Sequence, residues 1–410
     1  MIKCGLLGRH LVHSYSPQIH RSLGDYPYGI FEIEPDGVAD FLRSADFTGI
    51  NVTIPYKKAV IPCCAELTPI AKRLGAVNTI VRLADGSLLG HNSDYFGFYA
   101  LVKRLGLDWK DKKVLVLGSG GASNTAVAVL EYLGAGPVVV SRTGVNHYQN
   151  LHLHRDAALI VNATPVGMYP NAEERIIDLD AFPALEAVVD LIYNPARTQL
   201  LLDAESRDLK AENGLYMLVA QAKESAEYFT GSAICDTVID KIYAQLKRQM
   251  ENIALVGMPG CGKSTVGAAL AEKLERRFVD TDREIEAMAG CSIPDIFMEQ
   301  GEQGFRALET AVLARFGKES GLVIATGGGC VTREENYLHL HSNSRIFWLQ
   351  RSLELLPRGG RPLSLAGELD AMYAGREPMY RRFADHIICN DGAVNDTIGS
   401  ILGSFEGDII

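Results

Sequence analysis

The sequence is poor in cysteine and has no long uninterrupted apolar segment. Its 410 residues include only eight cysteines, and no two of them form a CxxC pair. This number is too small for a disulfide scaffold, and the spacing does not suit a zinc site. No run reaches the roughly 18 apolar residues of a membrane-spanning helix, and the first residues lack the apolar core of a signal peptide. We therefore expect a cytoplasmic protein with free thiols.

Positive charge is also scarce, because 40 lysines and arginines face 50 acidic residues, for a net charge of −10. Nucleic acids and anionic membranes are bound by concentrated Lys and Arg. The composition therefore predicts no nucleic-acid partner and no membrane partner. It is compatible with small acidic substrates, since a few arginines in a pocket are enough to bind one.

Glycine-rich loops mark two places where an apolar strand passes into an amphipathic helix, at 118–123 and at 257–264. The alternation of apolar strands and helices predicts an α/β fold with parallel sheets covered on both faces. A single core rarely exceeds about 300 residues, so we expect several domains. Residues 1–100 are expected to form a small α/β substrate domain, completed by helices at about 216–248 with an interruption near Gly231. Residues 101–215 would form a Rossmann-like dinucleotide domain, and 251–410 a P-loop α/β domain.

The loop from Gly257 to Ser264 fits the pattern GxxxxGK[ST] between a strand and a helix. Glycines let the backbone N–H groups approach phosphates, while Lys263 reaches the terminal phosphates and Ser264 ligates Mg²⁺. We therefore predict that this part of the chain binds a nucleoside triphosphate. Cys261 is interpreted as a small filler in the loop.

Residues beyond the loop indicate an anionic acceptor. Asp280 and Asp282 end the next strand, and we expect one carboxylate to serve Mg²⁺ and the other the acceptor hydroxyl. Arg306 and Arg376 have the fork geometry that holds a carboxylate by paired hydrogen bonds.

This ordered set, with Gly301–Glu309, Ala325–Gly329, Arg361–Leu363 and Gly375–Tyr380, resembles shikimate kinase over residues 251–400. The resemblance implies that Asp282 binds the acceptor hydroxyl as base or orienter, and that Arg306, Gly328 and Arg376 hold shikimate. Asp280 would support Mg²⁺ through water, and Arg361 would close a lid over the phosphates. ATP would be held by the loop residues Gly260, Cys261, Gly262, Lys263, Ser264 and Thr265. The segment 350–361 is several residues shorter than is usual in that family.

The first glycine loop, Gly118–Ser123, follows a strand and opens a helix, where the pyrophosphate of a dinucleotide binds. The next strand ends in Ser141–Thr143. Arg142 at this position suits the 2′-phosphate of NADP better than the free ribose of NAD. Earlier in the chain, Lys57 follows a strand and Asp94 follows another. A lysine near an aspartate can exchange a proton with a substrate hydroxyl while hydride moves.

The motifs around 13–20, 51–57, 75–79, 90–97, 118–123, 141–143, 162–168, 190–195 and 213–225 occur in the order of shikimate dehydrogenase, which the first 245 residues resemble. The resemblance implies that Lys57 and Asp94 are the catalytic pair. Substrate-binding residues would be Ser14, Ser16, Thr53, Asn78, Tyr193 and Gln221. The cofactor NADP(H) would be bound by Gly118, Gly120, Gly121, Ala122, Ser123, Arg142, Thr143 and Gly214. Only one short helix fits between Arg142 and the following strand.

The leading interpretation is a bifunctional enzyme that reduces 3-dehydroshikimate to shikimate with NADPH and then phosphorylates shikimate with ATP and Mg²⁺. A second interpretation is a regulator that binds metabolites of the same route without turning them over. A third is that the first half oxidises quinate or shikimate with NAD. The presence of Lys57, Asp94, Lys263 and Asp282 favours the first interpretation.

Overall fold

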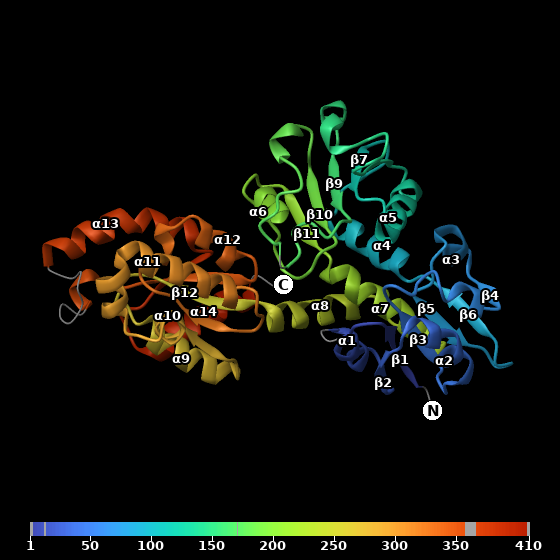
Figure 1. Cartoon of the computed structure of the whole chain (residues 1–410), viewed down its shortest axis with the longest axis horizontal. Helices are drawn as coiled ribbons and strands as arrows, with labels where there is room; N and C mark the ends of the chain where they lie inside the picture. The colour runs from blue at the N-terminus through green and yellow to red at the C-terminus, as the bar shows by residue number, and fades with distance from the viewer. Residues whose placement is uncertain (1–2, 12–13, 170, 357–365, 408–410) are drawn as a thin grey trace. The chain divides into compact units, whose positions relative to one another are not determined.

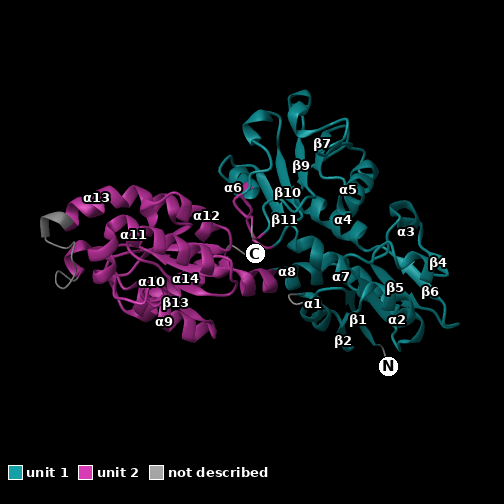
Figure 2. Ribbon diagram, viewed as in Figure 1, with its two compact units in different colours: residues 1–168, 174–193, 200–243 teal, residues 169–173, 194–199, 244–410 magenta. Residues whose placement is uncertain are grey.

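The computed structural model describes residues 3–11, 14–169, 171–356 and 366–407 (Figure 1). The chain divides into two compact units, coloured separately in Figure 2. The first comprises residues 1–168, 174–193 and 200–243, and the second comprises 169–173, 194–199 and 244–410. Within the described ranges, no helix is both long enough and apolar enough to cross a membrane.

The first sheet is mixed, with strand order β2-β1-β3-β5-β6-β4. Its strands are β1 (Cys4–Gly8), β2 (Tyr28–Glu32), β3 (Gly49–Val52), β4 (Glu66–Leu67), β5 (Thr79–Arg82) and β6 (Leu88–His91). The parallel pairing expected from the strand–loop–helix units does not extend to the whole of this sheet, because β5 is antiparallel to both β3 and β6. The short turn between β5 and β6 can join only antiparallel neighbours. The accompanying helices are α1 (Ser16–Leu23), η1 (Pro35–Gly37), α2 (Val38–Ser44), η2 (Ile61–Cys63) and α3 (Pro69–Leu74).

The second sheet of the first unit is parallel, with order β11-β10-β9-β7-β8. Its strands are β7 (Lys113–Leu117), β8 (Gly136–Val140), β9 (Leu159–Asn162), β10 (Ala187–Asp190) and β11 (Lys210–Asn213). The helices are α4 (Asp94–Arg104), α5 (Gly121–Tyr132), η3 (Tyr148–His154), η4 (Leu179–Ala181), α6 (Gln199–Glu205), α7 (Leu215–Thr230) and α8 (Thr237–Met250). The one short helix expected after Arg142 is η3, which is of the 3-10 type.

Helix α7 ends where the sequence predicted an interruption, at Gly231, which adopts a left-handed conformation with φ +66°. Helices α4 and α7 pack closely, because a Cβ at Gly97 of α4 would lie only 2.8 Å from the carbonyl oxygen of Met217. This close approach sets residues at the start of α4 beside residues of α7.

The second unit contains a five-stranded parallel sheet with order β13-β14-β12-β15-β16. Its strands are β12 (Asn252–Val256), β13 (Phe278–Asp280), β14 (Val323–Ala325), β15 (Ser344–Gln350) and β16 (His386–Cys389). The helices are α9 (Lys263–Leu274), α10 (Thr281–Ala289), α11 (Ile293–Phe316), η5 (Cys330–Thr332), α12 (Glu335–His341), η6 (Leu353–Leu355), α13 (Ala366–Phe383) and α14 (Val394–Gly407). Strand β12 is central and buried along its whole length, and the loops after β12, β13 and β14 meet at one edge of the sheet.

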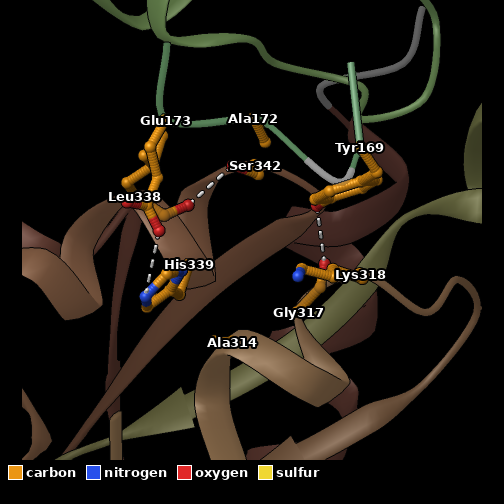
Figure 3. Close-up of a pocket in the computed structure, with 9 residues that line it drawn as sticks. All are labelled: Tyr169, Ala172, Glu173, Ala314, Gly317, Lys318, Leu338, His339 and Ser342. Carbon is orange, nitrogen blue, oxygen red and sulfur yellow. Dashed lines mark hydrogen bonds and ion pairs between the residues drawn. The ribbon is translucent and has the colours of Figure 1, made fainter. Parts of the chain in front are cut away.

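Two short segments that precede α8 in the chain also belong to the second unit. The Tyr169 hydroxyl donates to the carbonyl of Gly317 at 3.3 Å, and Glu173 lies 3.9 Å from His339, around a small pocket (Figure 3). The backbone N–H of Arg197 donates to Ser342 at 2.9 Å. The second unit is therefore assembled from three stretches of chain.

Candidate active sites

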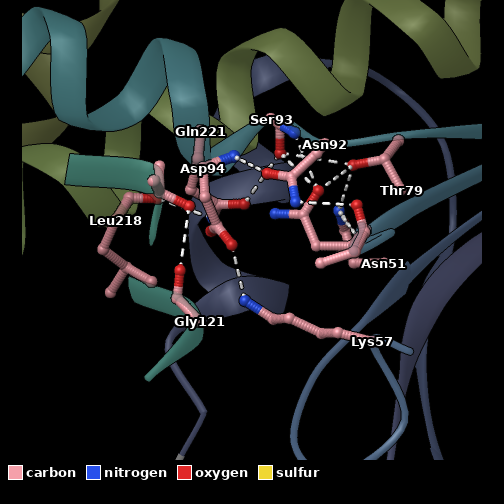
Figure 4. A network of polar contacts seen from close by, with 12 residues as sticks. Asn51, Lys57, Thr79, Asn92, Ser93, Asp94, Gly121, Leu218 and Gln221 are labelled. Atoms are coloured by element: carbon pink, nitrogen blue, oxygen red, sulfur yellow. Dashed lines mark hydrogen bonds and ion pairs between the residues drawn. The ribbon is translucent and has the colours of Figure 1, made fainter. Parts of the chain in front are cut away.

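Lys57 and Asp94 meet in the first unit as an ion pair. Lys57 lies in the turn after β3, and Asp94 is the first residue of α4. The lysine Nζ is 2.6 Å from Asp94 Oδ2 (Figure 4), and the two side chains are 32% and 19% exposed. The backbone N–H of Asp94 donates to Asn92 Oδ1 at 3.1 Å, which fixes the start of the helix. A half-buried lysine in contact with a carboxylate has the geometry to transfer a proton to a bound carbonyl compound.

Asn78 and Gln221 lie beside this pair and are connected through Ser93. Asn78 precedes β5, and its Oδ1 accepts from the backbone N–H of Ser93 at 2.8 Å. Gln221 is on α7, and its Oε1 accepts from the Ser93 hydroxyl at 3.3 Å. Asn51 belongs to the same network through its contact with the carbonyl of Asn78 at 3.3 Å. Ser93 and Asn51 stand inside the motifs quoted from the sequence but were not selected as site residues.

The serine loop and Tyr193 also lie near one another. The Ser14 hydroxyl accepts from the backbone N–H of Ser16 at 3.2 Å. The ring of Tyr15, between these serines, lies 6.3 Å from the ring of Tyr193 in an edge-to-face arrangement. Burial raises the pKa of the Tyr193 phenol, so this group is a neutral hydrogen-bond donor. Thr53 follows β3, and its backbone N–H donates to the carbonyl of Leu7 at 2.9 Å.

The first glycine loop has the form of a dinucleotide site. Gly118 has φ +109°, and a Cβ there would lie 2.9 Å from Thr164 Cγ2, so only glycine fits. Gly120 precedes α5, and a Cβ at Gly120 or Gly121 would meet open space. Ala122 and Ser123 follow in the first turn of α5. The helix N-terminus therefore presents its free backbone N–H groups to an accessible region, as the binding of a pyrophosphate requires.

Two further predicted cofactor groups flank this loop. Arg142 and Thr143 are exposed directly after β8. Burial raises the pKa of Tyr148, and the positive charge of Arg142 opposes that shift. Gly214 caps α7, and a Cβ there would lie 2.1 Å from the carbonyl oxygen of Leu191. The exposed guanidinium at the end of the second strand fits the 2′-phosphate of NADP.

The second glycine loop adopts the conformation of a phosphate-binding loop. Gly257, Gly260 and Gly262 have φ values of +144°, +82° and +102°, which L side chains rarely adopt. The Lys263 ammonium donates to the carbonyls of Gly257 at 2.8 Å and Met258 at 3.0 Å. Cys261 is fully buried in the core, as expected of a filler, and Thr265 lies in the first turn of α9.

Ser264 and Asp280 have the chemistry of a Mg²⁺ site. The Ser264 hydroxyl donates to Asp280 Oδ2 at 2.6 Å. Hard oxygen donors of this kind, with few protein ligands, suit Mg²⁺ that also binds water and substrate phosphates. Within the described ranges no cluster of three or more His, Cys, Asp or Glu side chains could hold a metal ion by itself.

The expectation that Asp280 and Asp282 both end a strand is wrong for Asp282. Strand β13 ends at Asp280, and Asp282 lies in the first turn of α10. The Asp280 carboxylate caps this helix by accepting from the Asp282 N–H at 3.1 Å. A residue type that favours helix N-caps therefore outweighs the strand pattern. The two carboxylates have different neighbours. Asp280 accepts from Ser264, whereas Asp282 Oδ1 lies beside Gly327, which follows β14, at 3.0 Å from where a Cβ of Gly327 would be.

Arg306 lies in a buried ion pair near Asp282. Its guanidinium donates to Glu309 at 2.8 Å and to Glu302 at 3.3 Å. Burial raises the pKa of Glu309, and Arg306 opposes that shift. A Cβ at Gly329 would lie 2.1 Å from the Arg306 guanidinium, so glycine is required there. Glu309 and Gly329 occur in the quoted motifs without an assigned role.

Arg376 approaches the same region from α13. Its guanidinium donates to the carbonyl of Gly328 at 3.2 Å, and the Tyr380 hydroxyl donates to the same oxygen. Gly328 is packed against Pro259 of the phosphate loop, since a Cβ there would lie 2.7 Å from the proline ring. The structure thus brings Asp282, Arg306, Gly328 and Arg376 to the edge that carries the phosphate loop. Arg361 lies outside the described residues.

Two family models match parts of the chain. The shikimate kinase family model matches residues 259–404, and that of the shikimate dehydrogenase substrate binding domain matches residues 6–80. Shikimate dehydrogenase (NADP(+)) of Clostridium perfringens is 33% identical in a match of 266 residues that covers 59% of this chain and 97% of that protein.

Solved structures resemble the same part of the chain. Shikimate dehydrogenase 1 from Peptoclostridium difficile is 36% identical with a TM-score of 0.55, over 60% of this chain and 98% of that one. Shikimate 5-dehydrogenase from Thermus thermophilus, solved in complex with NADP(H) and shikimate, is 30% identical with a TM-score of 0.55, over 60% of this chain and 99% of that one.

Proposed function

Because the chain belongs to the shikimate dehydrogenase family and carries a shikimate kinase domain, a combination that makes it a bifunctional oxidoreductase and kinase, we propose that it catalyses two consecutive reactions. The first unit reduces 3-dehydroshikimate to shikimate, and the second phosphorylates shikimate to shikimate 3-phosphate. The reduction creates the 3-hydroxyl group that the kinase then uses. The contact between Lys57 and Asp94 carries the proposal for the first reaction.

In the reduction, NADPH supplies the hydride when it is bound. Lys57 is placed to donate a proton to the carbonyl oxygen that becomes the new hydroxyl, and Asp94 holds the ammonium in position at 2.6 Å. Asn78, Gln221 and Thr53 would bind the ring hydroxyls, while Ser14, Ser16 and Tyr193 would bind the carboxylate side of the substrate. Because the Oδ1 of Asn78 is already bonded to Ser93, its amide nitrogen is the group left for a ligand.

In the kinase, Mg²⁺ neutralises phosphate charge when bound, and Ser264 and Asp280 are the groups that would hold it. Lys263 would stabilise charge on the transferred phosphoryl group. Asp282 would orient or deprotonate the attacking hydroxyl. Arg306 and Arg376 would pair with the shikimate carboxylate and hydroxyls, which places the acceptor at the phosphate-loop edge of the sheet.

The test is one assay with the full chain, 3-dehydroshikimate, NADPH and Mg-ATP. We expect NADPH absorbance to fall and ADP to appear, with ADP release from 3-dehydroshikimate dependent on NADPH. Shikimate should support ADP release without NADPH. Binding of these compounds without any turnover would instead support a regulator and would contradict the proposal.

The exposed Arg142 leads to a prediction about the cofactor. An Arg142→Asp variant removes the charge that suits the 2′-phosphate and offers a carboxylate to the free ribose hydroxyls of NAD. We expect the ratio of kcat/KM with NADPH to that with NADH to fall by about tenfold or more, as for the loss of one charge-assisted contact. Arg155→Asp, on the exposed end of the same connection, is the control. An unchanged ratio in Arg142→Asp would refute the assignment.

A further inference from the structure

Three hydroxyl groups form a closed cluster behind the proposed substrate site. They belong to Thr79 of β5, Ser93 before α4 and Ser225 of α7, and all three side chains are fully buried. Ser225 Oγ lies 2.9 Å from Thr79 Oγ1 and 2.9 Å from Ser93 Oγ, while the latter two are 3.2 Å apart. Figure 4 shows Thr79, Ser93 and Gln221 at this point. Ser225 thus connects α7 both to strand β5, through Thr79, and to the residue before α4, Ser93.

The donors and acceptors of the cluster can be satisfied together. Asn51 Nδ2 donates to Ser225 Oγ at 2.8 Å, so Ser225 is an acceptor. Its own proton can then go to Thr79 Oγ1, whose proton goes to Asn78 Oδ1 at 3.0 Å. The Ser93 hydroxyl donates to Gln221 Oε1 at 3.3 Å. Each of the three hydroxyl protons therefore has its own acceptor, and Ser225 also accepts from Asn51.

This arrangement fixes which end of the Asn78 amide faces the ligand. Its Oδ1 is occupied by the Ser93 N–H at 2.8 Å and by the Thr79 hydroxyl. Among the residues that the structure describes, Asn78 Nδ2 donates to no partner. The amide is therefore held with its two N–H donors available. Those are the groups that bind a substrate hydroxyl through its oxygen.

A second path runs from the cluster to the serine loop. Asn51 Oδ1 accepts from the Tyr28 hydroxyl at 2.8 Å, and the Tyr28 ring stacks on His20 of α1, the helix that begins at Ser16. Asn51 is itself almost fully buried. Ser225 thus sits between the segment that carries Ser16 and the segment that carries Asn78.

We propose that Ser225 is a positioning residue that orients the Asn78 amide toward the substrate of the dehydrogenase. It acts through Asn51 and Thr79 and does not contact the substrate. The inference rests on the proposed function, in which Asn78 binds a ring hydroxyl. Loss of the Ser225 hydroxyl would free Thr79 to rotate and would leave the Asn78 oxygen held by Ser93 alone, so that the amide is less firmly oriented.

The experiment measures shikimate oxidation by the full-length Ser225→Ala, Asn78→Ala and double variants. We expect Ser225→Ala to raise KM for shikimate about fivefold, the effect of one net hydrogen bond, with kcat changed less. Asn78→Ala should raise KM by at least as much. Because Ser225 acts through Asn78, the double variant should have the KM of Asn78→Ala alone. Ser225→Cys replaces the hydroxyl by a somewhat larger thiol that forms weaker hydrogen bonds and should give an intermediate KM.

Thr230→Ala is the matched control, because Thr230 lies on the same helix and its hydroxyl donates to the Ala226 carbonyl at 2.8 Å, while none of its contacts within the described residues reaches Asn51, Thr79 or Ser93. Its KM should equal that of the unmodified chain. If Asn78→Ala raises KM while Ser225→Ala does not, or if the two effects multiply in the double variant, the inference fails alone. If Asn78→Ala leaves KM unchanged, the binding role of Asn78 fails as well. The kinase rate of each variant calibrates the amount of active protein.

Discussion

A Lys57→Ala variant is expected to lose the reduction of 3-dehydroshikimate while it keeps its kinase activity. Lys57 supplies the ammonium held 2.6 Å from Asp94, and in the described residues of the proposed site no other lysine is paired with that carboxylate. Removal of a positioned general acid lowers a rate by about 10²–10⁴-fold. We expect a loss of kcat of this size, measured by NADPH absorbance, with ADP release from shikimate near that of the unmodified chain.

Lys58 provides a matched control in the same turn, because it is exposed and next in sequence. Lys58→Ala should leave both rates close to those of the unmodified chain. A parallel loss of both activities in Lys57→Ala would show that the two units do not work independently. A dehydrogenase rate reduced by less than about tenfold would remove Lys57 from the role of general acid.

The glycine loops could be predicted well because their signals are local. Gly118 and Gly257 to Gly262 lie between an apolar strand and a helix, and the left-handed φ of these glycines is set within a few residues. The same locality explains why the interruption near Gly231 was confirmed. Lys57 and Asp94 could be paired only through a family resemblance, since they are far apart in sequence and their contact depends on how β3 and α4 come together.

Features that depend on distant partners were missed. The antiparallel pairing of β5 could not be read from its apolar run, which looks the same in either direction. Asp282 was placed on a strand because its neighbours are strand-like, whereas the cap formed by Asp280 starts a helix one residue earlier. The role of Ser225 cannot be predicted from the sequence, because a serine on a helix has no distinctive pattern. Its contacts with Asn51, Thr79 and Ser93 exist only in the folded chain.

The complementary variant, Lys263→Ala, is expected to abolish the kinase reaction and leave NADPH oxidation unchanged. The Lys263 side chain is buried, and its ammonium donates to the carbonyls of Gly257 and Met258 in the phosphate-binding loop. A charge fixed in this position acts most strongly when negative charge shifts between the terminal phosphates. Loss of one such group lowers kcat by about 10²–10³-fold, which ADP release from shikimate would measure.

Lys273→Ala, at the exposed last turn of the same helix, separates this effect from a general loss of positive charge on α9. It should keep both activities. Binding of MgADP to Lys263→Ala should weaken far less than kcat falls, because the backbone N–H groups of the loop still hold the phosphates. If MgADP binding and kcat fell equally, Lys263 would serve to build the loop rather than to stabilise the transferred group. Retention of the kinase rate would exclude it from the chemistry altogether.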